Sequence, residues 1–186
     1  MESLAVLELD SIARGIDVTD HMAKMALVEI TRSHPIDPGR YLIVIRGDAD
    51  STRLSLDRGR ERAGDTVVDE LHLAHVHPAV PEAMHGSWIM SDLDTIGVIE
   101  TSSVASIVRA ADRALKAAPT SLLRLHLARR TGGKGYLVIT GTQADVEASL
   151  GAGSSAAGEF GAWHDHALIP APSAELLAEL QKEWIA

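Results

Sequence analysis

The stretch LAVLELDSIARGIDVTDHMAKMA, residues 4–26, has a second copy later in the chain, IGVIETSSVASIVRAADRALKAA, residues 96–118. A further pair, YLIVIRGDAD from Tyr41 and GYLVITGTQAD from Gly135, follows in the same order once two residues are inserted in the second copy. Such self-similarity is typical of a duplicated structural unit, so we expect two tandem domains, residues 1–90 and 91–186. Polar positions recur at a constant offset: Glu8 with Glu100, Ser11 with Ser103, Asp20 with Asp112, and Lys24 with Lys116.

Both copies predict the same order of elements. A short apolar run, 5–9 or 96–100, indicates a strand, and the serine after it is an N-cap candidate for a helix that ends near Met25 or Ala117. Two strands follow, and the second of these leads through a glycine into another helix, with Asp48 or Thr142 as its N-cap. A last strand is expected over 67–76 in the first copy. Each unit is therefore expected to be β-α-β-β-α-β, an α+β fold related to the ferredoxin-like one, with helices on one face of a four-stranded antiparallel sheet.

The remaining segments connect or follow these units. Residues 78–93 are rich in turn-forming residues and are expected to form the linker. The stretch 151–158, GAGSSAAG, predicts a helix of small residues that lies close to a neighbour. After Ser173, apolar residues at helical spacing, including Leu176, Leu180 and Trp184, predict a docked terminal helix.

The composition excludes several classes of function. The chain has 186 residues, of which 46% are apolar and 23% charged, as in ordinary globular proteins. No window approaches the roughly 18 apolar residues of a membrane span, and the net charge of −9 disfavours binding to nucleic acid or to anionic membranes. Because the chain has no cysteine, disulfides, thiolate metal sites and a cysteine nucleophile are excluded.

Three motifs suggest chemistry, but each has a simpler interpretation. The segment RTGGKGY, residues 130–136, resembles a phosphate-binding loop, but Ala128 and Gly135 stand where that motif needs a glycine and a Ser or Thr. Histidines at 72, 75, 77, 164 and 166 suggest a metal site, but strand alternation would separate His72 from His75 and His77. Glu8 and Glu100 are more simply explained as one structural residue that was copied by the duplication.

The repeated unit resembles the shell-protein domain of bacterial microcompartments. The resemblance rests on GVIETSSVASIVRAADRALKAA, on the loop and strand GGKGYLVITG, and on AGEFG before the last strand. Two such units in tandem, each beginning with the first strand, resemble the non-permuted, trimer-forming (BMC-T) class of shell protein, of the type found in propanediol-utilisation compartments. The resemblance covers nearly the whole chain.

The resemblance implies a structural protein and not an enzyme. It implies a homotrimer that mimics a hexagon, tiles with other shell proteins into the facets of a microcompartment within the cytoplasm, and leaves a central pore for metabolites or ions. Encapsulated enzymes are further candidate partners, whereas nucleic acid and membranes are not. Lys24 and Lys116 match the lysine that in this family lies along the edge of the tile. The arginine that is frequent after the late proline is replaced by Ala79 and Ala171.

The resemblance also implies which residues surround the pore. In the first copy these are Ser33, His34, Pro35, Ile36, Asp37 and Pro38, and in the second Arg129, Arg130, Thr131, Gly132 and Gly133. Similar proteins carry a cysteine at the position of Asp37 that helps to hold an iron–sulfur cluster, so no such cluster and no cofactor is expected here. A threefold ring of Asp37 carboxylates is a candidate cation site. Alternatively, Asp37 caps its own turn or pairs with Arg129 or Arg130.

Two other classes of function stay open on the sequence. A trimeric small-molecule sensor built on similar α+β units would need a long ligand loop, which this chain does not show. An enzyme would need clustered titratable groups at a cleft, and the sequence places none together.

Overall fold

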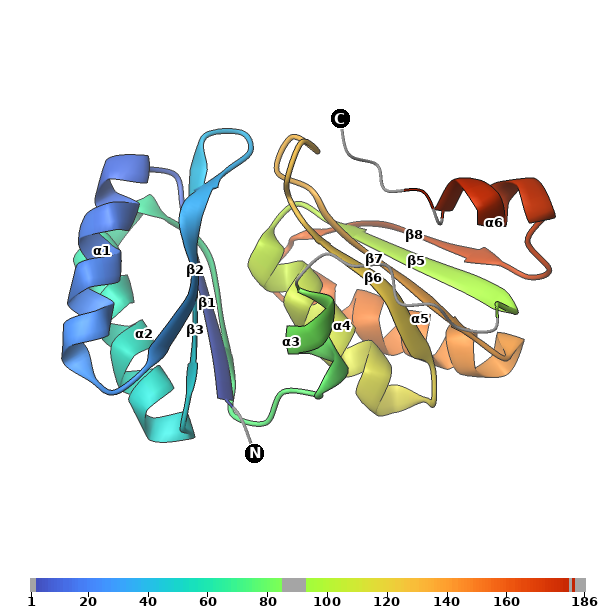
Figure 1. Ribbon diagram of the computed structural model, residues 1–186, viewed down its shortest axis with the longest axis horizontal. Coiled ribbons are helices and arrows are strands. Elements are labelled where there is room, and N and C mark those ends of the chain that lie inside the picture. The colour runs from blue at the N-terminus through green and yellow to red at the C-terminus, as the bar shows by residue number, and fades with distance from the viewer. Residues whose placement is uncertain (1–2, 85–92, 181, 183–186) are drawn as a thin grey trace.

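The computed structural model describes residues 3–84, 93–180 and 182. It contains two similar domains that lie side by side, each with a sheet and two long helices (Figure 1). The first domain consists of β1 (Ser3–Leu9), α1 (Ile12–Met25), β2 (Glu29–Ile36), β3 (Arg40–Gly47), α2 (Ala49–Ala63), a 3-10 turn (Gly64–Thr66) and β4 (Val67–Leu73). The second consists of β5 (Thr95–Thr101), α4 (Val104–Ala117), β6 (Ser121–Leu127), β7 (Gly135–Gly141), α5 (Gln143–Gly158) and β8 (Trp163–Ile169). The short helices α3 (Ala79–Ala83) and α6 (Ala174–Leu180) follow the two domains.

Both sheets have the same topology. Their strand orders are β2-β3-β1-β4 and β6-β7-β5-β8, and every pairing is antiparallel. This confirms the predicted tandem α+β fold with its β-α-β-β-α-β units. The expected boundary between residues 90 and 91 lies outside the described residues.

The helices begin where the sequence predicts. Ser11 and Ser103 accept hydrogen bonds from the backbone N–H groups of Arg14 and Ser106, which satisfies donors in the first turns of α1 and α4. Asp48 and Thr142 cap α2 and α5 in the same way. All four predicted N-caps are therefore confirmed.

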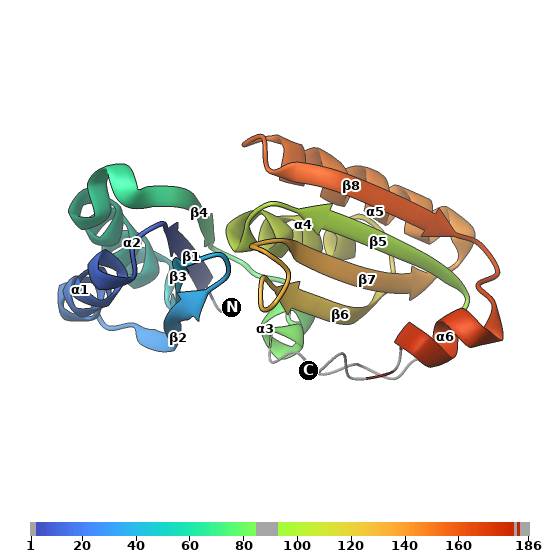
Figure 2. The ribbon, with the colours of Figure 1, turned by 90° about the horizontal axis from the view of Figure 1, so that it is seen from above.

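Strand β1 is buried along its whole length because both faces of the first sheet are covered. Ala5, Leu7 and Leu9 pack with α1 and α2 on one face. Leu4 and Val6 lie on the opposite face and pack in one hydrophobic core with α4 of the second domain. Helix α4 therefore lies between the two sheets, and its burial joins the domains into one molecule (Figures 1 and 2).

Close packing between helix and sheet is achieved differently in the two domains. In the first, a Cβ atom on Gly15 of α1 would lie 2.3 Å from the Tyr41 ring, so the glycine makes room for the tyrosine. In the second, the large and small residues are exchanged, since Ile107 of α4 lies over Gly135. The predicted small-residue helix is confirmed, because Gly153 of α5 approaches the backbone of Ala110 in α4.

Several predicted boundaries are wrong. The predicted strand 67–76 ends at Leu73, so strand alternation does not apply to His75 and His77. The expected linker 78–93 begins with α3, and its residues 85–92 lie outside the described part of the chain, so this expectation stays a prediction. Much of the expected loop 33–41 is strand, because residues 33–36 pair with β3 and leave only 37–39 as the turn. The predicted terminal helix is present, with Leu176, Leu177 and Leu180 packed against the second sheet, whereas Trp184 lies outside the described residues.

Candidate pore and assembly surfaces

The turns of the β2–β3 and β6–β7 hairpins lie on the same side of the molecule, at the top of Figure 1, and approach one another (Figures 1 and 2). The backbone at Gly133 is so close to the first hairpin that a Cβ there would lie 2.9 Å from Pro38 Cδ and 3.3 Å from the Asp37 carbonyl oxygen. Gly133 has a φ of +91°, which also favours glycine. The two segments expected at the pore are therefore neighbours within one chain.

Asp37 lies at the tip of the first hairpin and is half-buried. The Gly39 N–H donates to the Ile36 carbonyl at 3.0 Å and closes the turn, and the Asp37–Pro38 peptide bond is cis. Within residues 3–84, 93–180 and 182, no hydrogen bond or ion pair reaches the Asp37 carboxylate. Neither the capping bond nor the ion pair with Arg129 or Arg130 is therefore formed in the single chain.

The second hairpin is held by its own backbone and by a histidine. The Thr131 hydroxyl donates to the Lys134 carbonyl at 2.6 Å, and His126 Nε2 lies 2.7 Å from the Arg129 carbonyl. The His126 ring stacks on Tyr136, and burial lowers the pKa of His126 below its usual range. Arg129 and Arg130 are exposed. Their guanidinium groups are thus available at the rim of the hairpin.

Glu8 lies in the contact between the first sheet and the N-terminus of α4, which forms the seam between the two domains. Its carboxylate, which is fully buried, accepts hydrogen bonds from Arg40 Nη1 and from the Val104 N–H, both at 2.7 Å. The same Arg40 nitrogen donates to the Ser102 carbonyl at 3.0 Å. Burial raises the pKa of Glu8, and the bonds from Arg40 and Val104 oppose that rise. Glu8 is therefore a structural acceptor at the first turn of α4, in agreement with its simpler interpretation.

A second acidic residue reinforces the seam beside Glu8. Asp69 of β4 accepts hydrogen bonds from the hydroxyls of Ser103 and Ser106, and the Ser106 bond is 2.7 Å long. Arg109 lies 3.6 Å from the Asp69 carboxylate and donates to the Glu70 carbonyl at 2.7 Å. The N-terminus of α4 is thus docked on the first sheet by carboxylates on two adjacent strands.

Arg40, Asp69 and Arg109 were not predicted from the sequence as residues of this contact. The internal alignment contained a signal for two of them. Asp69 pairs with Glu8 across the sheet, as Asp165 pairs with Glu100 in the second copy. Arg40, the first residue of β3, corresponds to Lys134, which immediately precedes β7. Lys134 Nζ lies 2.5 Å from the Glu100 carboxylate.

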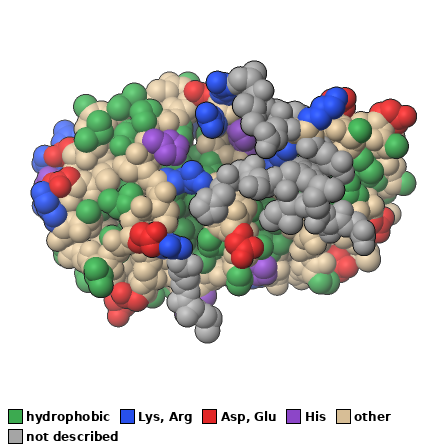
Figure 3. All heavy atoms as spheres, viewed as in Figure 1, with side chains coloured by type: hydrophobic (Ala, Val, Ile, Leu, Met, Phe, Trp, Pro, Cys, Tyr) green, Lys and Arg blue, Asp and Glu red, His purple; other side chains and the backbone are tan. Residues whose placement is uncertain are grey.

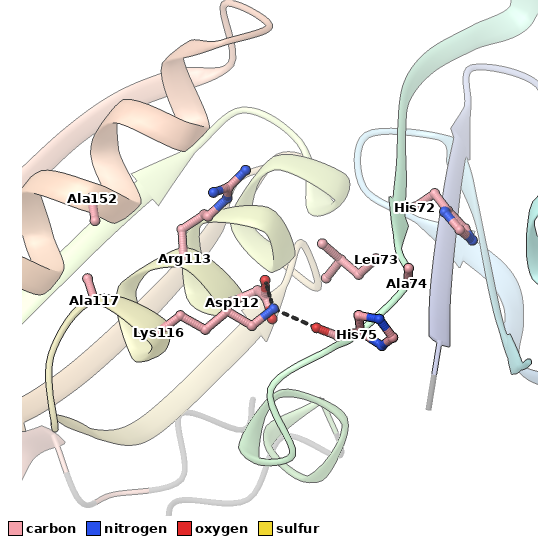
Figure 4. Close-up of a pocket in the computed structure, with 9 residues that line it drawn as sticks. All are labelled: His72, Leu73, Ala74, His75, Asp112, Arg113, Lys116, Ala117 and Ala152. Atoms are coloured by element: carbon pink, nitrogen blue, oxygen red, sulfur yellow. Dashed lines mark hydrogen bonds and ion pairs between the residues drawn. The ribbon is translucent and has the colours of Figure 1, made fainter. Parts of the chain in front are cut away.

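The two predicted edge lysines lie in different surroundings. Lys24 is largely exposed and forms an ion pair with Asp20 at 2.6 Å. Lys116 forms the equivalent pair with Asp112 at 2.6 Å and also donates to the His75 carbonyl at 2.5 Å, so that it contacts the segment after β4 (Figure 4). Asp112 also accepts the His77 N–H at 2.8 Å. An open hollow beside these contacts is lined by His75, Asp112 and Lys116, together with Leu73, Ala117 and Ala152.

His72, the first of the candidate histidines, is held by hydroxyl groups of the first domain. His72 Nε2 lies 3.0 Å from the Thr52 hydroxyl and 3.3 Å from that of Ser3, and burial lowers the pKa of His72.

Among the described residues, no group of three or more potential ligands could hold a metal ion, and no helix is long and apolar enough to cross a membrane. Charged side chains of both signs are scattered over the face shown in Figure 3, and basic ones gather where the domains meet.

Comparisons with known proteins agree with the duplicated architecture. The model of the BMC domain family matches the chain twice, over residues 3–80 and 95–172. The bacterial microcompartment shell protein PduT of Citrobacter freundii is 37% identical over 171 residues, which are 92% of this chain and 93% of PduT. The shell protein EutK of Salmonella typhimurium is 35% identical over 66 residues, 36% of this chain and 40% of EutK.

Solved structures show the same relationship. A microcompartment protein from Desulfitobacterium hafniense DCB superposes with a TM-score of 0.85 at 36% identity, over 96% of this chain and 99% of that one. The fused permuted hexameric shell protein MSM0275 of the RMM microcompartment has a TM-score of 0.64 at 20% identity, over 84% and 83% of the two chains, and so shares the fold. Because the family model matches both halves and a relative aligns over nearly its whole length, the chain belongs to the BMC-domain family of bacterial microcompartment shell proteins, in the tandem form.

Proposed function

We propose that this chain is a structural, non-enzymatic component of a microcompartment shell, and that it forms a homotrimeric pseudohexamer with a central pore. The observation that carries the proposal is the position of the two hairpins. They come from different domains and lie next to each other where the domains adjoin (Figure 1), as expected if both contribute to one axis. Each chain then supplies two similar wedges of a closed tile.

The proposed partners are further copies of this chain and other shell proteins, with encapsulated enzymes as additional candidates. The proposed location is the microcompartment shell within the cytoplasm. We assign no cofactor to the pore, since the chain has no cysteine to ligate an iron–sulfur cluster.

Asp37 is proposed to set the charge of the pore. A threefold axis would bring three copies of the hairpin tip together, and in the single chain the described residues place no partner on the Asp37 carboxylate. Rings of carboxylates favour cations, whereas rings of Arg or Lys favour anions. Arg129 and Arg130, which are exposed on the neighbouring hairpin, would lie farther out and attract anionic solutes.

The proposal is tested by the particle mass and by electron microscopy of the concentrated protein. Light scattering is expected to give about three chains per particle, and the particles are expected to form sheets. A stable monomer at micromolar concentration would contradict the proposed tile.

The role of Asp37 is tested separately by solute passage through assembled shells. Asp37→Lys is expected to slow cations and speed anions, with Asp50→Lys on the exposed start of α2 as a control for total charge. Equal passage of cations and anions through shells of both variants and of the unmodified protein would contradict the role of Asp37 in the pore. It would not contradict the proposed tile.

A further inference from the structure

The two domains differ at the connection from helix to strand after α1 and after α4. Both connections lie on the side of the molecule opposite the hairpin turns, at the bottom of Figure 1. After α1 the surface is apolar and protrudes, because Leu27 is 91% exposed and Met25 is 47% exposed. Their counterparts after α4 are the smaller Pro119 and Ala117. The surface at Met25 and Leu27 is the first-domain edge, and the surface at Ala117 and Pro119 is the second-domain edge.

The second-domain edge adjoins the hollow beside α4. Ala117 and Ala152 line this hollow together with Leu73 of β4 (Figure 4). In the first copy the positions of Ala117 and Ala152 are taken by Met25 and Arg58, so the short side chains of the second copy help to keep the hollow open. Its volume is about 460 Å³, within the range of pockets that take small organic groups. The hollow therefore has room for an aliphatic side chain.

The hollow also carries an unpaired positive charge. Arg113 lines it, is exposed, and forms no hydrogen bond or ion pair with the described residues. The ammonium group of Lys116, at the same hollow, is already bound to Asp112. The counterpart of Arg113 in the first copy is His21, which lies 3.7 Å from an Asp17 carboxylate oxygen of its own helix. A free guanidinium is thus a feature of the second-domain edge.

The first-domain edge carries the opposite charge beside its protruding side chain. A Cβ on Gly47 would lie 3.4 Å from the Leu27 carbonyl oxygen, so the start of α2 lies next to Leu27. Asp48 follows Gly47 and is exposed. The hydrogen bond from the Ser51 N–H lowers the pKa of Asp48, which is therefore ionised at neutral pH. The counterpart of Asp48 in the second copy is the uncharged Thr142.

The packing of hexagonal tiles determines which edges meet. In the proposed trimer, edges of the first and second domains alternate around the tile, so opposite edges belong to different domains. When all tiles share one orientation, each edge faces the opposite edge of its neighbour, and every contact joins unlike edges. Contacts between like edges need neighbours in opposite orientations, which three mutually touching tiles cannot all have. A sheet with a single kind of contact therefore joins unlike edges.

We propose that the first-domain edge of one tile docks on the second-domain edge of a second copy of this chain, with Leu27 in the hollow beside Ala117 and Asp48 facing Arg113. This inference rests on the proposed function and specifies which edges of the tiles meet. The contact is head-to-tail, and such contacts extend into open arrays when the rotation does not close them. Two first-domain edges would instead bring the same protruding and acidic groups to both sides, which is unfavourable.

Cross-linking between introduced cysteines tests this pairing, because the chain has no cysteine of its own. Ala26→Cys, next to Leu27, and Ala117→Cys are small changes at accessible positions and retain Leu27. The two variants are prepared separately, one with an affinity tag that changes its mass, and are mixed before sheets form. A short bismaleimide is expected to join tagged to untagged chains in the mixed sheets. The yield in sheets of either variant alone is expected to be at least about tenfold lower, because like edges are not brought together.

The mixture diluted until only isolated trimers remain is the control for links within one trimer, and it is expected to give no product. Two results in sheets would overturn the pairing. One is cross-linking of either variant alone as efficiently as in the mixture, which would show that like edges meet. The other is the absence of cross-links from the mixed sheets. Either result leaves the proposed tile intact, whereas failure of the unmodified protein to form sheets would refute lateral assembly and this contact with it.

Discussion

At the Glu8 carboxylate, folding removes a negative charge from water and replaces its hydration with Arg40 and the first turn of α4. Burial alone would favour the neutral acid, which is why the pKa of Glu8 is raised in spite of its donors. A buried ion pair of this kind adds little net stability, but removal of one partner leaves an uncompensated charge. The seam therefore depends on the pair as a unit.

Replacement of Arg40 by alanine is expected to lower the free energy of unfolding by about 3 kcal/mol, the lower end for a broken buried pair, because Arg40 is 27% exposed. Arg40→Lys is expected to cost less, since Lys134 fills the equivalent position. Arg46→Ala, with its exposed partner Glu29, is the control and is expected to cost less than about 1 kcal/mol. Urea unfolding measures the free energy of unfolding of the three variants. A smaller decrease for Arg40→Ala than for Arg46→Ala would contradict the role of Arg40 as the partner of buried Glu8.

His72 predicts a dependence of stability on pH. Burial lowers its pKa in the folded state, so the unfolded chain binds the proton more readily. The stability that neutral His72 contributes is fully present above the pKa of histidine in the unfolded chain, about 6.5. It is lost as the pH falls from that value toward the lower pKa of His72 in the folded state. The unmodified protein is expected to lose more stability than His72→Gln between pH 7.5 and pH 5.5. Equal losses in urea unfolding would show that His72 does not titrate with folding.

At the scale of the element, the packing of α1 on its sheet depends on the missing side chain at Gly15. Gly15→Ala would place a methyl group 2.3 Å from the Tyr41 ring and is expected to cost about 1–3 kcal/mol, the usual penalty for overpacking. Gly151→Ala in α5 is a matched control, because a Cβ there meets no atom within 4 Å and helix propensity favours alanine by about 1 kcal/mol. The midpoint temperature of thermal unfolding is therefore expected to fall for Gly15→Ala and to rise for Gly151→Ala. A higher midpoint for Gly15→Ala than for the unmodified protein would contradict the packing argument.

At the scale of the whole molecule, lateral assembly is expected to depend on Lys24. Its side chain is 73% exposed, so its apolar stem and ammonium group are available to a neighbouring tile. Lys24→Ala is expected to reduce sheet formation in electron micrographs without a change in trimer mass. Lys182→Ala, also exposed, serves as control.

Lys116 is expected to behave differently from Lys24. It already binds Asp112 and the His75 carbonyl inside the chain, so Lys116→Ala should also lower stability slightly. If both lysines can be replaced by alanine and sheets form as before, the tile edge lies elsewhere.

The duplication, the order of elements and the helix starts could be predicted from the sequence, because they depend on local patterns of apolar residues and N-caps. The sequence also excluded cysteine-ligated clusters. Strand ends were less predictable: residues 33–36 were expected in a loop, but they pair with β3, and pairing depends on a partner strand as well as on the residues themselves.

The difference in burial between the two copies could not be predicted from the sequence, because it depends on contacts between the domains. The sequences of α1 and α4 are similar, and nothing local distinguishes the exposed Ile16 from the buried Val108. The difference arises because the first sheet packs on α4, and the bond from the Val104 N–H to Glu8 joins residues far apart in the chain. Burial is a property of the surrounding molecule, so the seam, and the open surfaces that correspond to it, could be identified only once both domains were placed together.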